Sequence, residues 1–223
     1  MAIALDPARS GLAHGFHPVA PGDLAAVVTA LEMTAPPAWL ARPGVEADVP
    51  LHLVRWEACT PDRYRLLYRR IGAPWLWWSR LALDDAALAA IIDDPAVEIY
   101  AVTDRARVEI GMVELDFRQA GACEIAFFGF VAKATGKGFG NWLMRRALQR
   151  AWAGGAARAP ISRVWVHTCT LDDPRAVGFY QRHGFVPTAR FVEVFRDPRA
   201  AGLLEPDSSA FHPLLQESGS KVA

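Results

Sequence analysis

The most specific chemistry in this sequence lies in residues 131–141, which read VAKATGKGFGN. An apolar run typical of a strand breaks here into glycines and continues at once as a pattern typical of an amphipathic helix. Gly136, Gly138 and Gly140 can adopt positive φ angles, and the first turn of the following helix leaves N–H groups without partners. Because these donors lie at the positive end of the helix dipole, the segment predicts a binding site for an anion.

The spacing of the glycines argues against two common nucleotide-binding signatures. In the triphosphate-binding loop, GxxxxGK is followed by Ser or Thr, whereas Lys137 is followed by Gly138. The dinucleotide fingerprint GxGxxG needs a third glycine at position 141 or 143, where the chain has Asn141 and Leu143. A nucleotide-binding protein is therefore a weak alternative, which predicts stabilisation by ATP or NAD.

A second motif lies downstream in residues 173–185, which read DPRAVGFYQRHGF. Together the two motifs resemble the GNAT superfamily of N-acetyltransferases, and the resemblance covers residues 51–197. The acyl-coenzyme A loop of that family reads Arg/Gln-x-x-Gly-x-Gly/Ala, and residues 135–140 match it except at Thr135. The family often ends its domain with Asn-x-x-Ala-x-x-x-Tyr-x-x-x-Gly-Phe. Its positions correspond here to Asp173, Ala176, Tyr180, Gly184 and Phe185, with Asp in place of Asn.

The resemblance implies acetyl-CoA as co-substrate and a set of residues that would hold it. The backbone of Phe130 and Val131 would bind the pantetheine arm as an added strand does, with the Val131 N–H near the thioester oxygen. The N–H groups of the glycine loop would hold the pyrophosphate. A solvated loop residue is an equal alternative for Lys137. The implied binding residues are Phe130, Val131, Gly136, Lys137, Gly138, Phe139, Gly140 and Asn141.

The resemblance also implies that an acetyl group moves to a primary amine by direct attack in a ternary complex. Tyr180 corresponds to a tyrosine that often protonates the coenzyme A thiolate, and Glu124 to a glutamate that receives the amine proton through water. Glu114 and Asp116 share a face of the preceding strand and compete with Glu124 for the role of base. Aromatic packing is the structural alternative for Tyr180, and an exposed strand-end carboxylate is the alternative for Glu124.

Three further groups of residues could belong to the site. Residues 74–78 (PWLWW) carry three tryptophans that could wall a pocket for an apolar or aromatic amine, although large aromatic side chains more often form core. His167 and Cys169 share a face of a later strand, and we favour core packing over a nucleophile pair. The three arginines of segment 145–150 could contact phosphates, but a solvated helix face is the simpler interpretation.

The elements that must position these residues follow from the hydrophobic pattern. Strands are predicted at 51–58, 97–103, 107–117, 122–131, 163–170 and 185–195, and helices at 61–71, 84–92, 141–152 and 174–182. This order is the one that the resemblance implies. We therefore expect an α/β fold (α+β in some schemes) with a mixed, mostly antiparallel sheet flanked by helices.

The chain divides into three predicted parts. Residues 1–50 form an N-terminal extension packed on the core, with a strand near residues 16–19 and a helix at 23–33. Residues 51–197 form the acetyltransferase domain. Residues 198–223 form an irregular, partly disordered tail.

Composition limits the partners and the location. Lys plus Arg and Asp plus Glu are 24 each, so net charge gives no indication of nucleic acid or an anionic membrane as a partner. The three cysteines lack metal-ligand spacing, so we expect reduced thiols and no metal. Neither a secretory signal nor a long apolar run is visible, and we expect a cytoplasmic protein.

The expected partner is a small-molecule or protein amine acceptor, and a homodimer is left open. A non-catalytic module that binds acyl-CoA or regulates another protein is the alternative to an enzyme. Thr135 stands where the family usually has Arg or Gln, which leaves room for that alternative.

Overall fold

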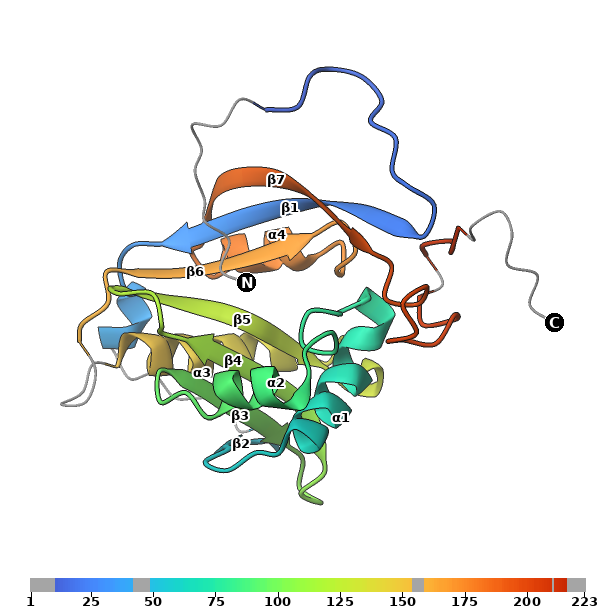
Figure 1. Cartoon of the computed structure of the whole chain (residues 1–223). Coiled ribbons are helices and arrows are strands. Elements are labelled where there is room, and N and C mark those ends of the chain that lie inside the picture. Colours follow the sequence, from blue (N-terminus) through green and yellow to red (C-terminus); the bar gives the residue numbers. More distant parts are fainter. Residues whose placement is uncertain (1–10, 42–48, 154–158, 210, 216–223) are drawn as a thin grey trace.

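A computed structural model describes residues 11–41, 49–153, 159–209 and 211–215. Its strands form one sheet with the order β2-β3-β4-β5-β6-β1-β7 (Figure 1). The strands are β1 (Asp23–Met33), β2 (His52–Arg55), β3 (Val97–Thr103), β4 (Glu109–Asp116), β5 (Ala122–Phe130), β6 (Arg163–Cys169) and β7 (Val186–Arg196). The helices are α1 (Pro61–Gly72), α2 (Asp85–Ile92), α3 (Phe139–Trp152) and α4 (Ala176–Arg182), with short 3-10 turns η1 (Ala38–Ala41), η2 (Ala73–Trp75) and η3 (Ala132–Ala134).

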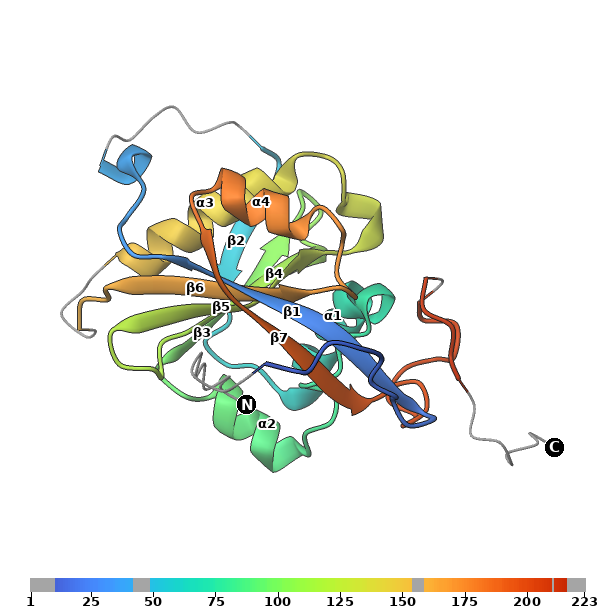
Figure 2. The same ribbon diagram turned by 90° about the horizontal axis from the view of Figure 1, so that it is seen from above.

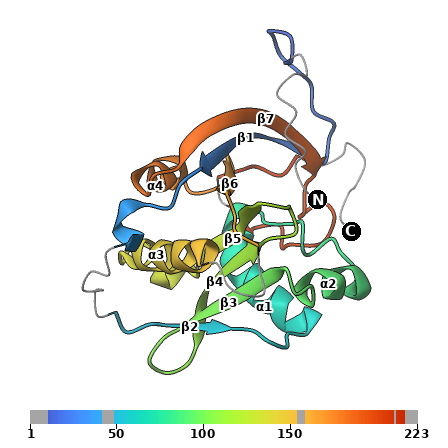
Figure 3. The same cartoon turned by 90° about the vertical axis from the view of Figure 1, so that its left-hand side faces the viewer.

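Neighbouring strands are antiparallel except for β5 and β6, which are parallel. Helices α1 and α2 cover one face of the sheet, and α3 and α4 cover the other (Figure 3). Each face buries its own apolar cluster, which includes Leu143 and Leu148 of α3 on one side and Tyr64 and Leu67 of α1 on the other. The predicted mixed, mostly antiparallel sheet flanked by helices is therefore confirmed.

The helix starts follow from the capping residues that the sequence carries. The Thr60 side chain accepts a hydrogen bond from the Arg63 N–H at the start of α1, and Asp84 accepts one from the Ala87 N–H at the start of α2. Both helices agree with their predicted ranges to within one residue. Among the described residues, no helix is long and apolar enough to cross a membrane.

The segment Asp23–Met33 is a strand, so the helix predicted there is wrong. Strand β1 lies between β6 and β7 and is antiparallel to both, with Val28 opposite Cys169 on one side and Phe191 on the other. Its hydrogen bonds to two neighbours outweigh the helix propensity of its alanines and leucines. The predicted extension therefore supplies a strand of the sheet, and the strand predicted near residues 16–19 is absent from the described structure.

The chain after β7 packs in turns beside the start of β1 (Figure 2). The Asp197 N–H donates to the Gly22 carbonyl, and the Arg199 guanidinium donates to both carboxylate oxygens of Asp197. Both side chains of this ion pair are almost fully buried. The described part of residues 198–223 has no helix or strand, but this pair fixes its beginning to the sheet.

Strands β5 and β6 separate soon after they begin. Their described pairing covers only Ala122, Cys123 and Glu124 of β5. Beyond Glu124, β5 continues with β4 alone and β6 continues with β1 alone. Ala126 has no partner on β4 and forms a β-bulge, which increases the local twist. The sheet therefore opens along the second half of β5.

Candidate active site

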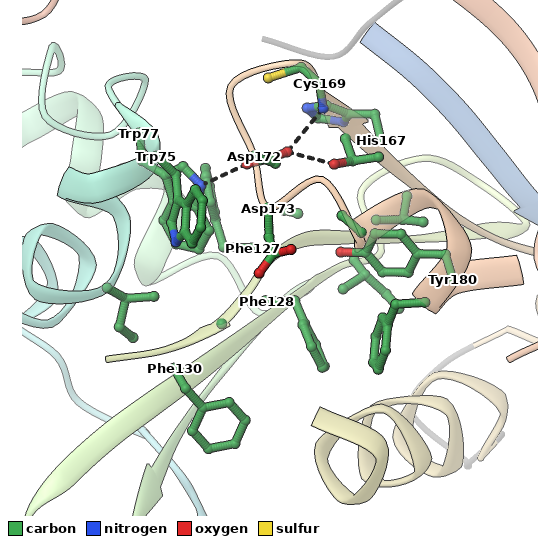
Figure 4. A pocket seen from close by; sticks show the side chains of 18 of the residues that line it. Trp75, Trp77, Phe127, Phe128, Phe130, His167, Cys169, Asp172, Asp173 and Tyr180 are labelled. Atoms are coloured by element: carbon green, nitrogen blue, oxygen red, sulfur yellow. Dashed lines mark hydrogen bonds between the residues drawn. The ribbon is translucent and has the colours of Figure 1, made fainter. Parts of the chain in front are cut away.

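The opening between β5 and β6 leads into a cavity of about 560 Å³ (Figure 4). Phe128 and Phe130 contribute to its wall and pack on the α3 side of the sheet. Phe127 also lines it but packs with Tyr68 and Trp77 on the α1 side. The cavity therefore reaches both faces of the sheet. The predicted site residues that line it are Glu124, Phe130, Gly136, Gly138, Phe139, Gly140, Asn141 and Tyr180, whereas Val131 and Lys137 do not.

The glycine loop presents open hydrogen-bond donors to this cavity. Gly136 and Gly138 have φ angles of 81° and 80°, and α3 begins without a side-chain cap. The N–H groups of residues 136–140 make no hydrogen bond within the described structure. These donors lie at the positive end of a 14-residue helix, which suits a phosphate group.

Gly140 differs from the prediction, because it lies in the first turn of α3 and its φ angle is not positive. A Cβ atom at this position would lie 3.3 Å from the ring of Phe179 in α4. The residue is small because α4 packs closely on the start of α3. The same contact brings His183 Nε2 to 3.1 Å from Asn141 Oδ1.

Thr135 does not contribute a cation, and its hydroxyl donates to the Val131 carbonyl at 3.4 Å. Two arginines that line the cavity come instead from the α4 region. Arg175 forms an ion pair with Asp173 at 2.6 Å. Arg182 has no ion pair or hydrogen bond among the described residues, so its charge is available to a ligand. Sequence reasoning missed Arg182, although it stands inside the second motif.

The three arginines of segment 145–150 do not line this cavity. The Arg145 guanidinium instead lies over the ring of Trp39, 4.0 Å from its centre. The suggestion that these arginines contact phosphates in this site therefore has no support from their position.

The Val131 N–H donates to the Ile110 carbonyl at 2.9 Å and continues the ladder between β5 and β4. This N–H is thus already bonded within the sheet, which argues against the predicted contact with the thioester oxygen. Backbone groups alternate in direction along an antiparallel pair, so the polar groups of Phe128 and Phe130 point toward β6. Because the described pairing with β6 has ended there, these groups face the opening.

Tyr180 lies in α4 with its ring against Phe179 and Phe185, and its hydroxyl points into the cavity toward Asp173 (Figure 4). Burial raises the pKa of this phenol well above its usual value, and the nearby carboxylate of Asp172 adds to the effect. The hydroxyl is therefore protonated at any working pH. It can donate a hydrogen bond, but it is a weak acid.

Glu124 and His167 meet at the point where β5 and β6 separate. Glu124 stands opposite Trp165 of β6, and His167 follows two residues later on the same face. The Glu124 Oε1 atom lies 3.4 Å from His167 Nδ1, which has no hydrogen-bond partner in the described structure. Both side chains line the cavity, so the core packing favoured for His167 is wrong. At 3.4 Å the two groups make an ion-pair contact and not a hydrogen bond, and one bridging water would let a proton pass between them.

Cys169 also lines the cavity, but it is not activated as a nucleophile. Burial, followed by the charge of Asp172, raises the pKa of the Cys169 thiol to about 12. A thiol with this pKa is almost entirely protonated near neutral pH. The geometry therefore disfavours a Cys/His nucleophile pair.

The two competing carboxylates are already paired. Glu114 is fully buried, accepts hydrogen bonds from Tyr64 and from Arg80 at 2.7 Å, and does not line the cavity. Asp116 lines the cavity but accepts hydrogen bonds from Arg118. Burial acts to raise the pKa of Asp116, but the hydrogen bonds and charge of Arg118 outweigh it and lower that pKa. Glu124 is thus the better-placed base.

All three tryptophans of segment 74–78 line the cavity. Trp77 packs against Tyr68 and Phe127, and its indole N–H donates to Asp172 at 3.4 Å (Figure 4). The segment therefore forms a cavity wall on the α1 side of the sheet.

No group of three or more His, Cys, Asp or Glu residues in the described structure could hold a metal ion.

Comparison with known proteins bears on the family and on the fold. The model of the acetyltransferase (GNAT) family matches residues 55–185. No curated protein matches the sequence.

Several solved structures are similar to this chain. A GCN5-related N-acetyltransferase from Sphaerobacter thermophilus has a TM-score of 0.52 at 16% identity, covering 82% of this chain and 53% of that one. Spermidine N-acetyltransferase from Vibrio cholerae, in complex with CoA and spermine, has a TM-score of 0.50 at 19% identity, covering 68% and 98%. A functionally unknown protein from Staphylococcus epidermidis has a TM-score of 0.50 at 13% identity, covering 79% and 64%. At these identities the likeness is one of fold, and the chain spans less than two thirds of the first and third proteins.

Proposed function

The chain belongs to the acetyltransferase (GNAT) family, and from this premise we propose that it transfers an acetyl group from acetyl-CoA to a primary amine by direct attack in a ternary complex. One observation carries the proposal. A single cavity through the sheet brings together the open N–H groups of the glycine loop, the Tyr180 hydroxyl and the Glu124–His167 pair. An anion-binding end, a proton donor and a proton acceptor thus share one space.

The residues of the cavity fit acetyl-CoA, which supplies an activated acyl group on a thiol leaving group. The N–H groups of residues 136–140 are suited to the pyrophosphate, and Arg182 adds a positive charge to the same cavity. The backbone groups of Phe128 and Phe130 are free to pair with the amides of the pantetheine arm, as an edge strand pairs with a peptide.

In the proposed reaction, the amine nitrogen forms a bond to the thioester carbonyl carbon and the carbon–sulfur bond breaks. The electron pair of that bond leaves with the sulfur, and one proton of the amine passes to Glu124 and His167, directly or through water. The Tyr180 hydroxyl donates to the sulfur as negative charge develops on it. Because the pKa of Tyr180 is raised, full proton transfer to a thiolate is uphill, and its contribution is modest.

We propose a small-molecule amine as the acceptor. The similar protein from Vibrio cholerae, whose fold the chain shares, is named for spermidine and was solved with spermine, both small amines. The homodimer and the cytoplasmic location stay predictions.

Thiol release from acetyl-CoA in the presence of a broad panel of amines tests the proposal, with thermal shift by CoA, ATP and NAD measured in parallel. We expect stabilisation by CoA and amine-dependent thiol release. Stabilisation by CoA without turnover of any amine would favour a non-catalytic module. Stabilisation by ATP or NAD, but not by CoA, would favour a nucleotide-binding protein.

A further inference from the structure

Two pairs of aromatic rings build the α1 side of the cavity. The rings of Trp77 and Phe127 lie 5.2 Å apart, and those of Trp78 and Phe195 stack at 5.3 Å with 13° between their planes. All four side chains line the cavity. The second pair joins the segment between α1 and α2 to the end of β7, which curves over toward that segment (Figure 1).

The backbone between these tryptophans adopts a conformation that is unfavourable for a residue with a side chain. Leu76 adopts a left-handed conformation with φ 55°, although it is not a glycine and its side chain is buried. Gly129 on β5 leaves space for this wall, because a Cβ atom there would lie 2.8 Å from Ile71 and 3.4 Å from the Trp77 ring. Residues held in this way at a cavity favour a binding role over simple core packing.

The net charge of this side of the cavity is negative. Arg80 and Arg118 line the cavity, but each is paired with a carboxylate, at 2.7 Å and 2.5 Å respectively. Glu193 of β7 also lines the cavity, and it has no ion pair or hydrogen bond within the described structure. Glu124 has His167 as its one ion-pair partner within the part of the chain that the structure describes. On the α3 side, the unpaired charge is the positive one of Arg182.

From the rings and the charges together, we infer that the acceptor is an arylalkylamine without a carboxylate. The aromatic body lies between the two ring pairs, and the alkyl chain directs the amine to Glu124 and His167. Flat rings give the body offset and edge contacts. The unpaired Glu193 attracts an ammonium group and repels the carboxylate of an amino acid. This inference rests on the proposed function, and the transfer step is the one given above with the arylalkylamine as nucleophile.

Binding to the CoA-loaded protein tests the acceptor class independently of turnover. Isothermal titration with tryptamine, tryptophan and spermidine compares an aromatic amine, the same ring with a carboxylate, and an aliphatic polyamine. We expect tryptamine to bind about 10-fold more tightly than either of the others. Equal or tighter binding of tryptophan or spermidine, or no binding of tryptamine, overturns the inference.

Thiol release from acetyl-CoA, measured with the same three compounds, separates this inference from the proposed function. Thiol release with spermidine alone would leave the acetyltransferase activity standing and reject the arylalkylamine. Tight binding of tryptamine without thiol release from acetyl-CoA would support the ligand class and reject the proposed transfer reaction.

Two variants locate the binding energy. Trp78→Ala removes one stacked ring and is expected to weaken tryptamine binding about 10-fold. Trp39→Ala, a partly buried tryptophan outside the cavity, is the matched control and should leave binding unchanged. Thermal shift by CoA checks that both variants are folded. Equal effects of the two substitutions on tryptamine binding would contradict the assignment.

Glu193→Gln tests the charge without disturbing the rings. The variant is expected to reduce the preference for tryptamine over tryptophan by about 5-fold, because it removes the repulsion of the amino-acid carboxylate. Glu57→Gln changes an exposed carboxylate away from the cavity and should leave the preference unaltered. An undiminished preference in Glu193→Gln would overturn the role of this residue.

Discussion

In the proposed reaction the Tyr180 hydroxyl donates a hydrogen bond to the leaving sulfur, and its surroundings keep it protonated. Burial, and secondarily Asp172, raise its pKa well above the usual range. Tyr180→Phe is therefore expected to lower kcat about 10-fold without changing the shape of the pH profile, because it removes a hydrogen bond to the leaving sulfur and not a full proton transfer. Initial rates of thiol release from pH 6 to pH 10 measure this. Unchanged kcat throughout would leave Tyr180 with a packing role only.

Glu124 and His167 act as one proton-accepting unit in the proposed mechanism, since their side chains lie 3.4 Å apart at the same point of the cavity. Glu124→Gln and His167→Gln should each lower kcat about 100-fold. The double variant should be little worse than either single variant, because residues that act as a unit are non-additive. Glu57→Gln is the control for loss of a carboxylate. Additive losses would indicate that the two side chains act separately.

Arg182 supplies the positive charge that Thr135 does not. Arg182→Gln is expected to raise KM for acetyl-CoA about 5- to 10-fold and to leave kcat unchanged, because a phosphate contact is equally strong before and during the reaction. Arg175→Gln is the comparison, since Arg175 is already paired with Asp173 and should matter less. A fall in kcat with unchanged KM for Arg182→Gln would contradict this assignment.

The contact between the start of α3 and the end of α4 contains a histidine whose protonation couples stability to pH. Burial, with the charges of Arg182 and Arg145, lowers the pKa of His183, whose Nε2 atom faces Asn141. The folded protein therefore holds His183 neutral while the unfolded chain takes up a proton below about pH 6.5. Stability is lost as the pH falls through this window. The aspartates with lowered pKa values act only below about pH 4 and do not overlap with it.

His183→Gln is expected to reduce the loss of Tm between pH 7.5 and pH 5 by about 2 °C relative to the parent protein. Gln keeps a group that can bond to Asn141 but does not titrate. Differential scanning fluorimetry at both pH values measures the effect. An equal loss of Tm in both proteins would mean that His183 does not control acid sensitivity.

Helices whose start is marked by nearby capping residues could be predicted from the sequence. Strand β1, which depends on distant partner strands, could not. Helices α1 and α2 carry their caps at Thr60 and Asp84, so their starts follow from a few adjacent residues. The segment Asp23–Met33 reads DLAAVVTALEM, which suits a helix as well as a strand. Its structure is decided by β6 and β7, which lie more than 130 residues away in the chain. No pattern within the segment indicates these partners.

The same distinction explains which parts of the site were predictable. The glycine loop is a strand, a turn and a helix in sequence, so Gly136 and Gly138 could be placed from spacing alone. The direction of the Val131 N–H depends on the register with β4, and the exposure of His167 depends on where β5 and β6 separate. Both depend on which strands pair and in what register, and the local sequence of each strand does not determine this.

The net charge of the chain is zero, but positive and negative charges are separated locally within the cavity. Among the described residues that line the cavity, Arg182 carries a positive charge without an ion-pair partner, and Glu193 carries a negative one; Glu124 and Asp172 add carboxylates that face no Arg or Lys. A phosphate-bearing substrate and an amine therefore meet opposite fields in one continuous space. Overall composition, which gave no indication of a charged partner, could not reveal this separation.

The opening between β5 and β6 predicts a specific pattern of hydrogen exchange when acetyl-CoA binds. If the pantetheine arm pairs with β5, acetyl-CoA should slow hydrogen exchange at the N–H groups of Phe128 and Phe130, which face the opening. The Val131 N–H is already bonded to Ile110 and serves as an internal control, with little change expected.

Residue-resolved hydrogen exchange with and without CoA measures the three amides together with residues 136–140. We expect slowing of about 10-fold or more at Phe128, Phe130 and the glycine loop. The pairing of β1 with β7 is continuous without a ligand, so its amides should be unaffected. Slowing confined to the glycine loop would mean that the pyrophosphate site exists but that the opened strand does not hold the pantetheine arm. Slowing spread evenly over all strands would instead indicate a general stabilisation without a specific site on β5.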